Sequence, residues 1–309
     1  MRELHALVID YMAFRVARGF QPNRKLARML DQFVDSLPAE RADGLLFSQS
    51  DALAWANAPV GASAVWLSDR MSMVRGFAAY VAGSGLPVGV PGLRLTPGGS
   101  RRATPYLYSA QEVRALMSAS DHLFGPLRAA TMRTLIGLLA VTGMRIGEAV
   151  RLTIGDVDWD RGIVTITHAK FGRQRVVLLD PGSRAALAAY LAVPARHRLG
   201  AGPSHPVFVT VKGAALAERT AQGAFQQMTQ HAGLSVRAGV RPRLHDFRHT
   251  FATTTMIEAY RFDRDPARTL TLLSVWLGHA NPADTYWYLQ AAPELAAVAA
   301  ARLEPGKES

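Results

Sequence analysis

A histidine and an arginine lie three positions apart in the segment 241–255, which reads RPRLHDFRHTFATTT. On a helix, His245 and Arg248 would share one face. An imidazole exchanges protons near neutral pH, and a guanidinium offers a planar fork of donors that matches phosphate oxygens. The pair therefore suggests chemistry on a phosphate ester. A histidine at a helix end beside a solvated arginine gives the same pattern, and the pair alone does not decide between the two.

Further candidates stand in a fixed order along the chain. Upstream, Arg145 lies at a glycine-bounded helix junction in the run TGMRIGE, and downstream His279 lies in LGHAN. Tyr288 comes nine residues after His279, in the run DTYWYL. The chain has four lysines, which are Lys25, Lys170, Lys212 and Lys307. Lys170 lies in the polar turn HAKFGRQ between two strand-like runs.

This ordered set of Arg, Lys, His-x-x-Arg, His and Tyr resembles the active-site signature of the tyrosine recombinase, or phage integrase, family. The resemblance runs from about Tyr106 to the end of the chain. The run TYWYL followed by Ala-Pro-Glu-Leu is most similar to integrases and transposases of bacterial mobile elements. The resemblance implies a site-specific recombinase that cleaves and rejoins DNA through a covalent 3′-phosphotyrosyl intermediate, for integration, excision or transposition.

The resemblance also implies a role for each residue that matches a family motif. The implied catalytic residues are Arg145, Lys170, His245, Arg248, His279 and Tyr288. A tyrosine hydroxyl is a weak nucleophile, so Tyr288 needs activation, and two guanidinium groups would bind the negative charge that develops on the phosphate oxygens. Lys170 would protonate the departing 5′ oxygen, His245 would shuttle the tyrosine proton, and His279 would donate to a phosphate oxygen. We expect Glu148, one helical turn after Arg145, to support that arginine.

Several positions keep a second interpretation. Lys212 is the alternative general acid, and Tyr286 is the alternative nucleophile beside Tyr288. His168 and His249 occupy no family catalytic position, which favours structural or phosphate-contacting roles. Trp276 lies at helical spacing from two leucines, and this favours a core position over chemistry.

The charge balance favours a polyanionic partner. Lysine and arginine number 35 against 24 acidic residues, a net charge of +11. Residues 1–100 contribute +2 of this charge and the rest of the chain contributes +9. We expect double-stranded DNA to be the partner, with no small-molecule substrate. Cysteine is absent, which excludes disulfides, thiolate zinc sites and a cysteine nucleophile.

No cofactor or metal is expected, because the phosphodiester is exchanged rather than hydrolysed and the two arginines do the work that a metal otherwise does. The N-terminus has no signal-peptide core, and the apolar stretches are too short to span a bilayer. These features predict a cytoplasmic protein, associated with the nucleoid in a prokaryote, with no membrane partner.

The predicted fold class is mainly α with a small antiparallel β-sheet, in two domains. Residues 1–90 are expected to form a helical core-DNA-binding domain of four helices, and 105–309 the tyrosine recombinase catalytic domain. A basic interdomain linker, 91–104, is rich in Gly, Pro and Ser. The predicted helices of the first domain cover residues 4–14, 26–37, 51–56 and 66–81.

In the second domain, Ser109 and Glu112 have the spacing of a capping box that opens a helix. A further helix is expected over 127–141, ending at Thr142-Gly143. The strand-like runs 162–168 and 175–179 predict a β-hairpin. Helices are then expected over 183–191, 220–232 and much of the chain from 245 to the end.

Two other functions fit much of the same pattern. A type IB topoisomerase uses similar residues and the same intermediate, and a non-catalytic DNA-binding relative would keep the fold alone. The family resemblance implies self-association into a tetramer on paired DNA sites. The Ala-rich segment 293–303 is expected to dock on a neighbouring protomer, with packing in its own protomer as the alternative. We see no obvious additional arm-binding domain at the N-terminus.

Overall fold

The computed structural model describes residues 2–38, 43–93, 95, 104–167, 174–262 and 265–278. The chain divides into two compact units, Met1–Ala103 and Thr104–Ser309. Most of the expected linker, the turn that carries Lys170, and the stretch 279–309 lie outside the described residues. In the described ranges, no helix is both long and apolar enough to cross a lipid bilayer.

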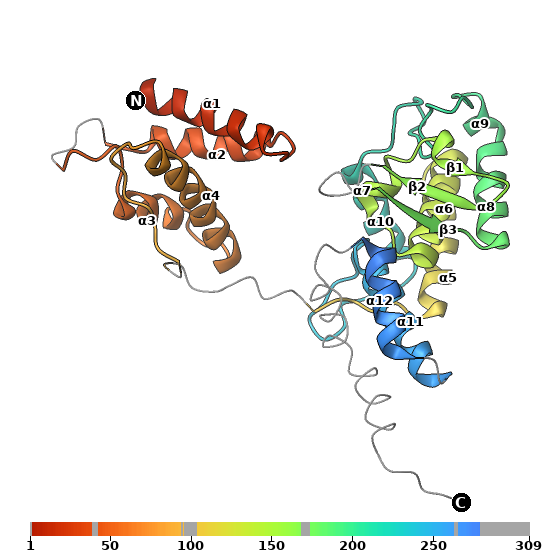
Figure 1. The fold of residues 1–309 in the computed structure, drawn as a ribbon. Helices are drawn as coiled ribbons and strands as arrows, with labels where there is room; N and C mark the ends of the chain where they lie inside the picture. The colour runs from red at the N-terminus through yellow and green to blue at the C-terminus, as the bar shows by residue number, and fades with distance from the viewer. Residues whose placement is uncertain are drawn as a thin grey trace, which may run out of the picture. The chain divides into compact units, whose positions relative to one another are not determined.

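The described part of the first unit is helical, as the sequence predicts (Figure 1). Its helices are α1 Arg2–Ala17, α2 Arg24–Asp35, α3 Gln49–Asn57 and α4 Ala64–Gly83. Polar side chains start these helices: Asn23 accepts a hydrogen bond from the backbone of Leu26, and Ser48 forms a capping box with Asp51. The core between the helices is aromatic, and Phe33 lies edge-on to Phe47 with 5.1 Å between ring centroids.

The second unit begins with two predicted helices whose ends follow from local sequence. Helix α5, Ala110–Ala119, starts at the capping box of Ser109 and Glu112. Helix α6, Pro126–Thr142, ends at Gly143, which adopts a left-handed conformation with φ 62°. The short helix α7, Ile146–Ala149, follows after one turn of chain. The predicted Arg145 therefore lies between two helices, at the N-cap of α7.

The described strands form a three-stranded antiparallel sheet in the order β1-β2-β3. Its strands are β1 Val157–Asp158, β2 Ile163–Ile166 and β3 Arg175–Leu178. The β2–β3 pair is the predicted hairpin, with Val164 opposite Val177 in the core. Strand β1 was not predicted, because two residues are too short to show an alternating pattern.

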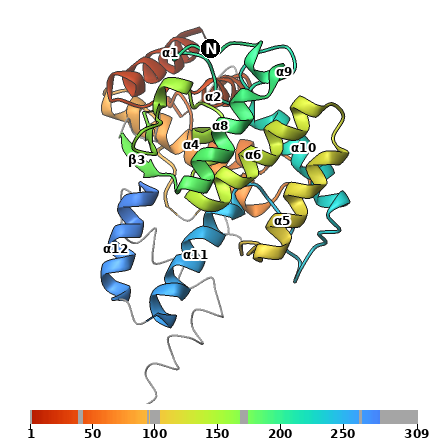
Figure 2. The same cartoon turned by 90° about the vertical axis from the view of Figure 1, so that its right-hand side faces the viewer.

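Several of the remaining elements pack against α6. The remaining elements are the 3₁₀ turns η1 Ser120–His122 and η2 Ile154–Asp156, and the helices α8 Pro181–Ala192, α9 Pro194–His197, α10 Glu218–His231, α11 Asp246–Arg261 and α12 Pro266–Leu277. Helix α6 packs against α5, α8, α10 and α11 (Figure 2). Helices α11 and α12 lie side by side (Figures 1 and 2). The end of α6, the start of α11 and the end of α12 are therefore brought together.

Candidate active site

Three of the six predicted catalytic residues lie in the described part of the chain, and all three lie where these helix ends meet. Arg145 follows the end of α6, and His245 and Arg248 belong to the start of α11. Lys170, His279 and Tyr288 lie outside the described residues, so their catalytic roles remain predictions.

Glu148 holds Arg145 in place, as the sequence predicts. The backbone amide of Arg145 donates to Oε2 of Glu148 at 2.9 Å, and its Nη1 donates to Oε1 at 2.9 Å. The Glu148 side chain is 2% exposed, whereas that of Arg145 is 29% exposed. The carboxylate thus fixes the arginine from the protein side and leaves part of the guanidinium accessible.

A second arginine, Arg175, shares the same carboxylate and was not identified from the sequence. Its Nη1 donates to Oε1 of Glu148 at 2.9 Å, and its Nη2 donates to Oε2 at 2.5 Å. Its Nε donates to the carbonyl oxygen of Trp276 at 2.9 Å. The sequence contains only a weak indication of this pair. Arg175 is a single cation at the start of an apolar strand, and Glu148 lies in an apolar stretch, where a buried carboxylate needs a partner.

The two arginines determine the protonation state of Glu148. Burial by itself raises the pKa of this carboxyl, but the hydrogen bonds and charge of Arg175, together with the hydrogen bonds of Arg145, outweigh burial and lower the pKa to about 2. Glu148 is therefore a carboxylate at neutral pH. A charged Arg145–Glu148–Arg175 group lies beneath the candidate site.

Arg248 is buried, with 1% of its surface exposed. Its Nη1 donates to the carbonyl oxygen of Gly143 at 3.0 Å, and its Nη2 donates to that of Leu277 at 2.6 Å. These two bonds join the start of α11 to the ends of α6 and α12. Gly143 cannot carry a side chain here, since a Cβ would lie 2.6 Å from the ring of Phe251.

His245 occupies the N-cap position of α11 without a side-chain capping hydrogen bond, and its surface is partly accessible. Its ring lies edge-on to that of His249, with 5.0 Å between centroids. Desolvation by the surrounding atoms lowers the pKa of His245 below its ordinary value, and the positive charges of Arg248 and Arg145 lower it further. The predicted histidine and both predicted arginines thus share one electrostatic environment, in which the neutral imidazole is favoured.

The structure also describes the positions of Trp276, His249 and Lys212. Trp276 is partly buried, as predicted for a core residue, and its Nε1 donates to the carbonyl oxygen of Thr142 at 2.8 Å. His249 is buried. Lys212 is exposed in a tight turn closed by the bridge between Val209 and Ala215.

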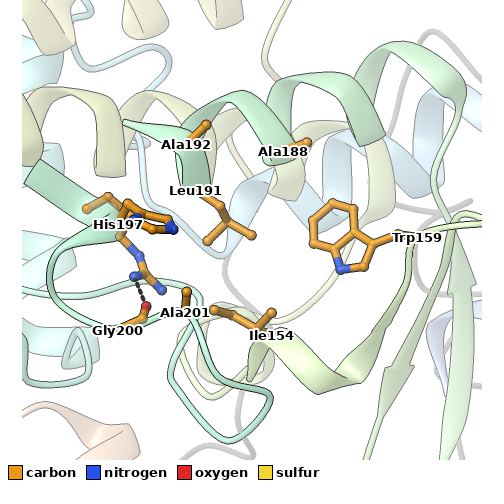
Figure 3. Close-up of a pocket in the computed structure, with 9 residues that line it drawn as sticks. Ile154, Trp159, Ala188, Leu191, Ala192, His197, Gly200 and Ala201 are labelled. Carbon is orange, nitrogen blue, oxygen red and sulfur yellow. Dashed lines mark hydrogen bonds between the residues drawn. The ribbon is translucent and has the colours of Figure 1, made fainter. Parts of the chain in front are cut away.

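A surface pocket of about 300 Å³ lies apart from these residues (Figure 3). Its lining is mostly apolar and includes Ile154, Trp159 and Leu191. Arg196 is also a lining residue, and it donates to the carbonyl oxygen of Gly200 at 2.7 Å. Arg145, His245 and Arg248, the predicted catalytic residues that the structure describes, are not among its lining residues. Across the described ranges, no cluster of three or more His, Asp or Glu side chains could hold a metal ion.

Comparisons with known proteins agree on one protein family. The model of the phage integrase family matches residues 107–294. A putative integrase/recombinase, y4rB, from Sinorhizobium fredii is 36% identical over 310 residues, covering 98% of each chain. The tyrosine recombinase XerC of Mycobacterium bovis is 28% identical, covering 92% of each chain.

The fold also has solved counterparts. The XerH site-specific recombinase, in a post-cleavage complex with its palindromic difH substrate, matches with a TM-score of 0.66. The match covers 91% of this chain and 78% of XerH, at 19% sequence identity. At this identity the likeness concerns the fold.

Proposed function

We propose a mechanism for this chain, which belongs to the phage integrase family and is a tyrosine-type site-specific recombinase. In this mechanism, Tyr288 attacks a DNA phosphodiester and forms a 3′-phosphotyrosyl bond. The observation that supports this most directly is the meeting of Arg145, His245 and Arg248 at the ends of α6 and α11. Two permanent cations beside a neutral imidazole suit a reaction that gathers negative charge on phosphorus-bound oxygens.

Each bond that forms in this reaction is matched by one that breaks, and neither water nor a cofactor takes part. The Tyr288 oxygen bonds to phosphorus as the bond to the 5′ oxygen breaks, and that oxygen leaves with the electron pair. Lys170 gives it a proton, and His245 takes the proton of the tyrosine hydroxyl. His279 donates a hydrogen bond to a non-bridging oxygen. The reverse reaction, with a 5′ hydroxyl from another strand, rejoins the DNA.

Each arginine has a protein partner that fixes its direction. Arg145 leans on a carboxylate, and Arg248 is anchored by two backbone carbonyl oxygens. These bonds fix the direction of each guanidinium fork. The side chain of Arg145 is 29% exposed and can donate to a phosphate directly, whereas Arg248 contributes a fixed positive charge from a buried position. Such preorganised donors need no rearrangement when charge develops.

Double-stranded DNA is the partner. The unit 1–90 is the core-DNA-binding domain, 91–104 is the linker, and 105–309 is the catalytic domain. Residues 101–309 carry +9 of the net charge of +11, so most of the attraction to phosphate comes from this part. The affinity for DNA should fall steeply as the salt concentration rises, with a slope of several units in a plot of log affinity against log salt concentration.

The enzyme works in the cytoplasm on nucleoid DNA, with no small-molecule substrate.

Recombination needs two sites and hence several protomers. The proposed assembly is a tetramer on paired sites, and a lambda integrase tetramer bound to a Holliday junction is a solved precedent with the same fold. The segment 293–303 would dock on a neighbouring protomer. Deletion of 292–309 should then leave single-site binding intact and impair recombination. Unchanged recombination by the truncated chain would rule out this docking.

Trapping a covalent protein–DNA adduct tests the reaction. A duplex chosen for binding from a random-sequence pool, nicked near the cleavage point so that the leaving strand diffuses away, should accumulate an adduct with the intact chain. A bound duplex without adduct would indicate a non-catalytic relative. Adducts without strand exchange between two such duplexes, but with relaxation of supercoiled plasmid, would indicate a topoisomerase.

A further inference from the structure

We propose that Arg175 is a positioning residue for this reaction: through Glu148 and the carbonyl of Trp276 it fixes the hairpin that carries Lys170 relative to Arg145 and the end of α12. The inference rests on the proposed roles of Lys170 and Arg145. Arg175 itself reaches no substrate in this account, and acts through the residues that it holds.

Arg175 reaches two distant parts of the chain from one buried position. Its side chain is 9% exposed, and the carboxylate that it meets is 2% exposed. Two parallel N–H bonds bind Glu148, 27 residues earlier, and the Nε bond reaches Trp276, 101 residues later. A bidentate pair of this kind fixes distance and angle together.

A guanidinium is required for this arrangement. Its rigid fork serves both carboxylate oxygens while Nε points to the carbonyl at the end of α12, whereas a lysine ammonium has no planar fork. The positive charge also suits the negative end of the helix dipole. Gly278 makes room for the side chain, because a Cβ there would lie 3.0 Å from Cδ of Arg175.

Fixing Arg175 fixes one end of the hairpin turn. Arg175 is the first residue of β3, and Lys170 lies five residues earlier in the sequence, in the predicted turn before this strand. The same guanidinium holds the carboxylate that holds Arg145. A single side chain thus holds both the support of Arg145 and the first residue of the strand that follows the proposed general acid in the sequence. Small displacements matter here, since an error of about 1 Å can slow a reaction roughly 100-fold.

The test separates positioning from general support of the fold. Arg175→Lys keeps the charge and loses the fork. Its single-turnover cleavage is compared on a selected duplex and on the same duplex with sulfur in place of the bridging 5′ oxygen. A thiolate leaves without a proton, so a misplaced general acid no longer matters. We expect a loss on the order of 10- to 100-fold with oxygen, and a clearly smaller loss with sulfur.

Arg184→Lys is the matched control. Arg184 is another arginine of the same unit that donates to carbonyl oxygens, those of Trp159 and Asp160 at 3.0 Å. It contacts neither Glu148 nor α12 in the described structure, so its replacement should change both rates by the same factor. Melting temperature and affinity for the duplex are measured for every variant.

If Arg175→Lys does not fold, the pair Arg175→Gln with Glu148→Gln replaces it, because removing both charges leaves no buried charge unpaired. Equal losses on oxygen and sulfur by a folded, DNA-binding variant would overturn the inference and leave the proposed reaction standing. Absence of adduct with the unaltered chain would overturn the reaction and the inference together. A selective recovery with sulfur would support the positioning role.

Discussion

The guanidinium of Arg248 donates to the carbonyl oxygen of Leu277 across 2.6 Å, joining the start of α11 to the last residue of α12. Arg175 makes the corresponding bond to Trp276, one residue earlier. Two cations therefore hold the C-terminal end of α12, where the helix dipole favours them. The chain reaches His279 two residues after Leu277. The same arginines that lie at the candidate site thus fix the end of α12, the last described element before the predicted nucleophile in the sequence.

The two predicted catalytic arginines should respond differently to truncation. Arg248→Ala leaves the carbonyls of Gly143 and Leu277 without this donor, and each unsatisfied buried group costs about 1–3 kcal/mol. Arg145→Ala removes a partly exposed side chain whose carboxylate partner keeps Arg175. We expect a clear drop in melting temperature for Arg248→Ala and little change for Arg145→Ala. Both should raise the activation free energy of single-turnover cleavage by about 3–4 kcal/mol, which is the effect of losing an oxyanion donor. Equal melting temperatures would contradict this account of Arg248.

A methyl group at Gly278 should disturb the packing of the Arg175 side chain. Gly278 has φ +66°, and an added Cβ would lie 3.0 Å from Cδ and 3.2 Å from Nη1 of Arg175. Gly233 also has φ +66°, but a Cβ there would meet nothing within 4 Å. Gly233→Ala therefore measures backbone strain alone, roughly 1–2 kcal/mol. Gly278→Ala should lower the free energy of unfolding by more, in denaturant titrations of both variants. The excess should vanish when Arg175 is also replaced by alanine.

Glu148 should make stability depend on acid. Its folded pKa of about 2 lies below the ordinary 4.5, so the unfolded chain binds the proton first. The stabilising contribution is thus complete above the unfolded pKa and is lost as the pH falls towards the folded pKa. We expect the difference in unfolding free energy between the unaltered chain and Glu148→Gln to shrink by on the order of 3 kcal/mol between pH 5 and pH 2. A constant difference over that range would show that Glu148 is not held as a carboxylate.

The sequence predicted elements whose signals are local. The capping box at Ser109, the helix end at Gly143 and the hairpin of β2 and β3 each depend on residues a few positions apart. The His-x-x-Arg pair could also be predicted, because residues three positions apart on a helix share one face. Such features are encoded where they occur.

Long-range partners could not be predicted in the same way. Arg175 in sequence is one cation before an apolar strand, and only the fold brings it to Glu148 and Trp276. Arg248 was expected to face phosphate, but the structure adds two carbonyl partners, one of them 105 residues earlier. These contacts depend on which helix ends meet, and no short pattern records that.

His245 should give the cleavage rate an acid limb. Desolvation and the charges of Arg248 and Arg145 lower its pKa below the ordinary 6.5. The neutral imidazole that accepts the tyrosine proton therefore persists to lower pH than in a free histidine. Single-turnover cleavage should be constant near neutral pH and fall only as the pH drops through this lowered pKa. His245→Asn should be slower and should lose this limb. An acid limb centred above 6.5 would contradict the assigned environment.

The choice of nucleophile between two neighbouring tyrosines can be decided by removing one oxygen at a time. Tyr288→Phe keeps the ring and loses the hydroxyl, so folding and DNA binding should survive while the covalent adduct disappears. Tyr286→Phe is the matched control, with the same atom removed two residues away, and it should still form adduct on the nicked duplex. Denaturing gels that resolve protein from protein–DNA adduct measure both variants, and a binding assay on the same duplex shows that each still engages DNA. Loss of adduct in Tyr286→Phe with retention in Tyr288→Phe would shift the motif register by two residues. The spacing of nine residues from His279 to the nucleophile would then be wrong, and the helix face on which the hydroxyl is presented would have to be reassigned.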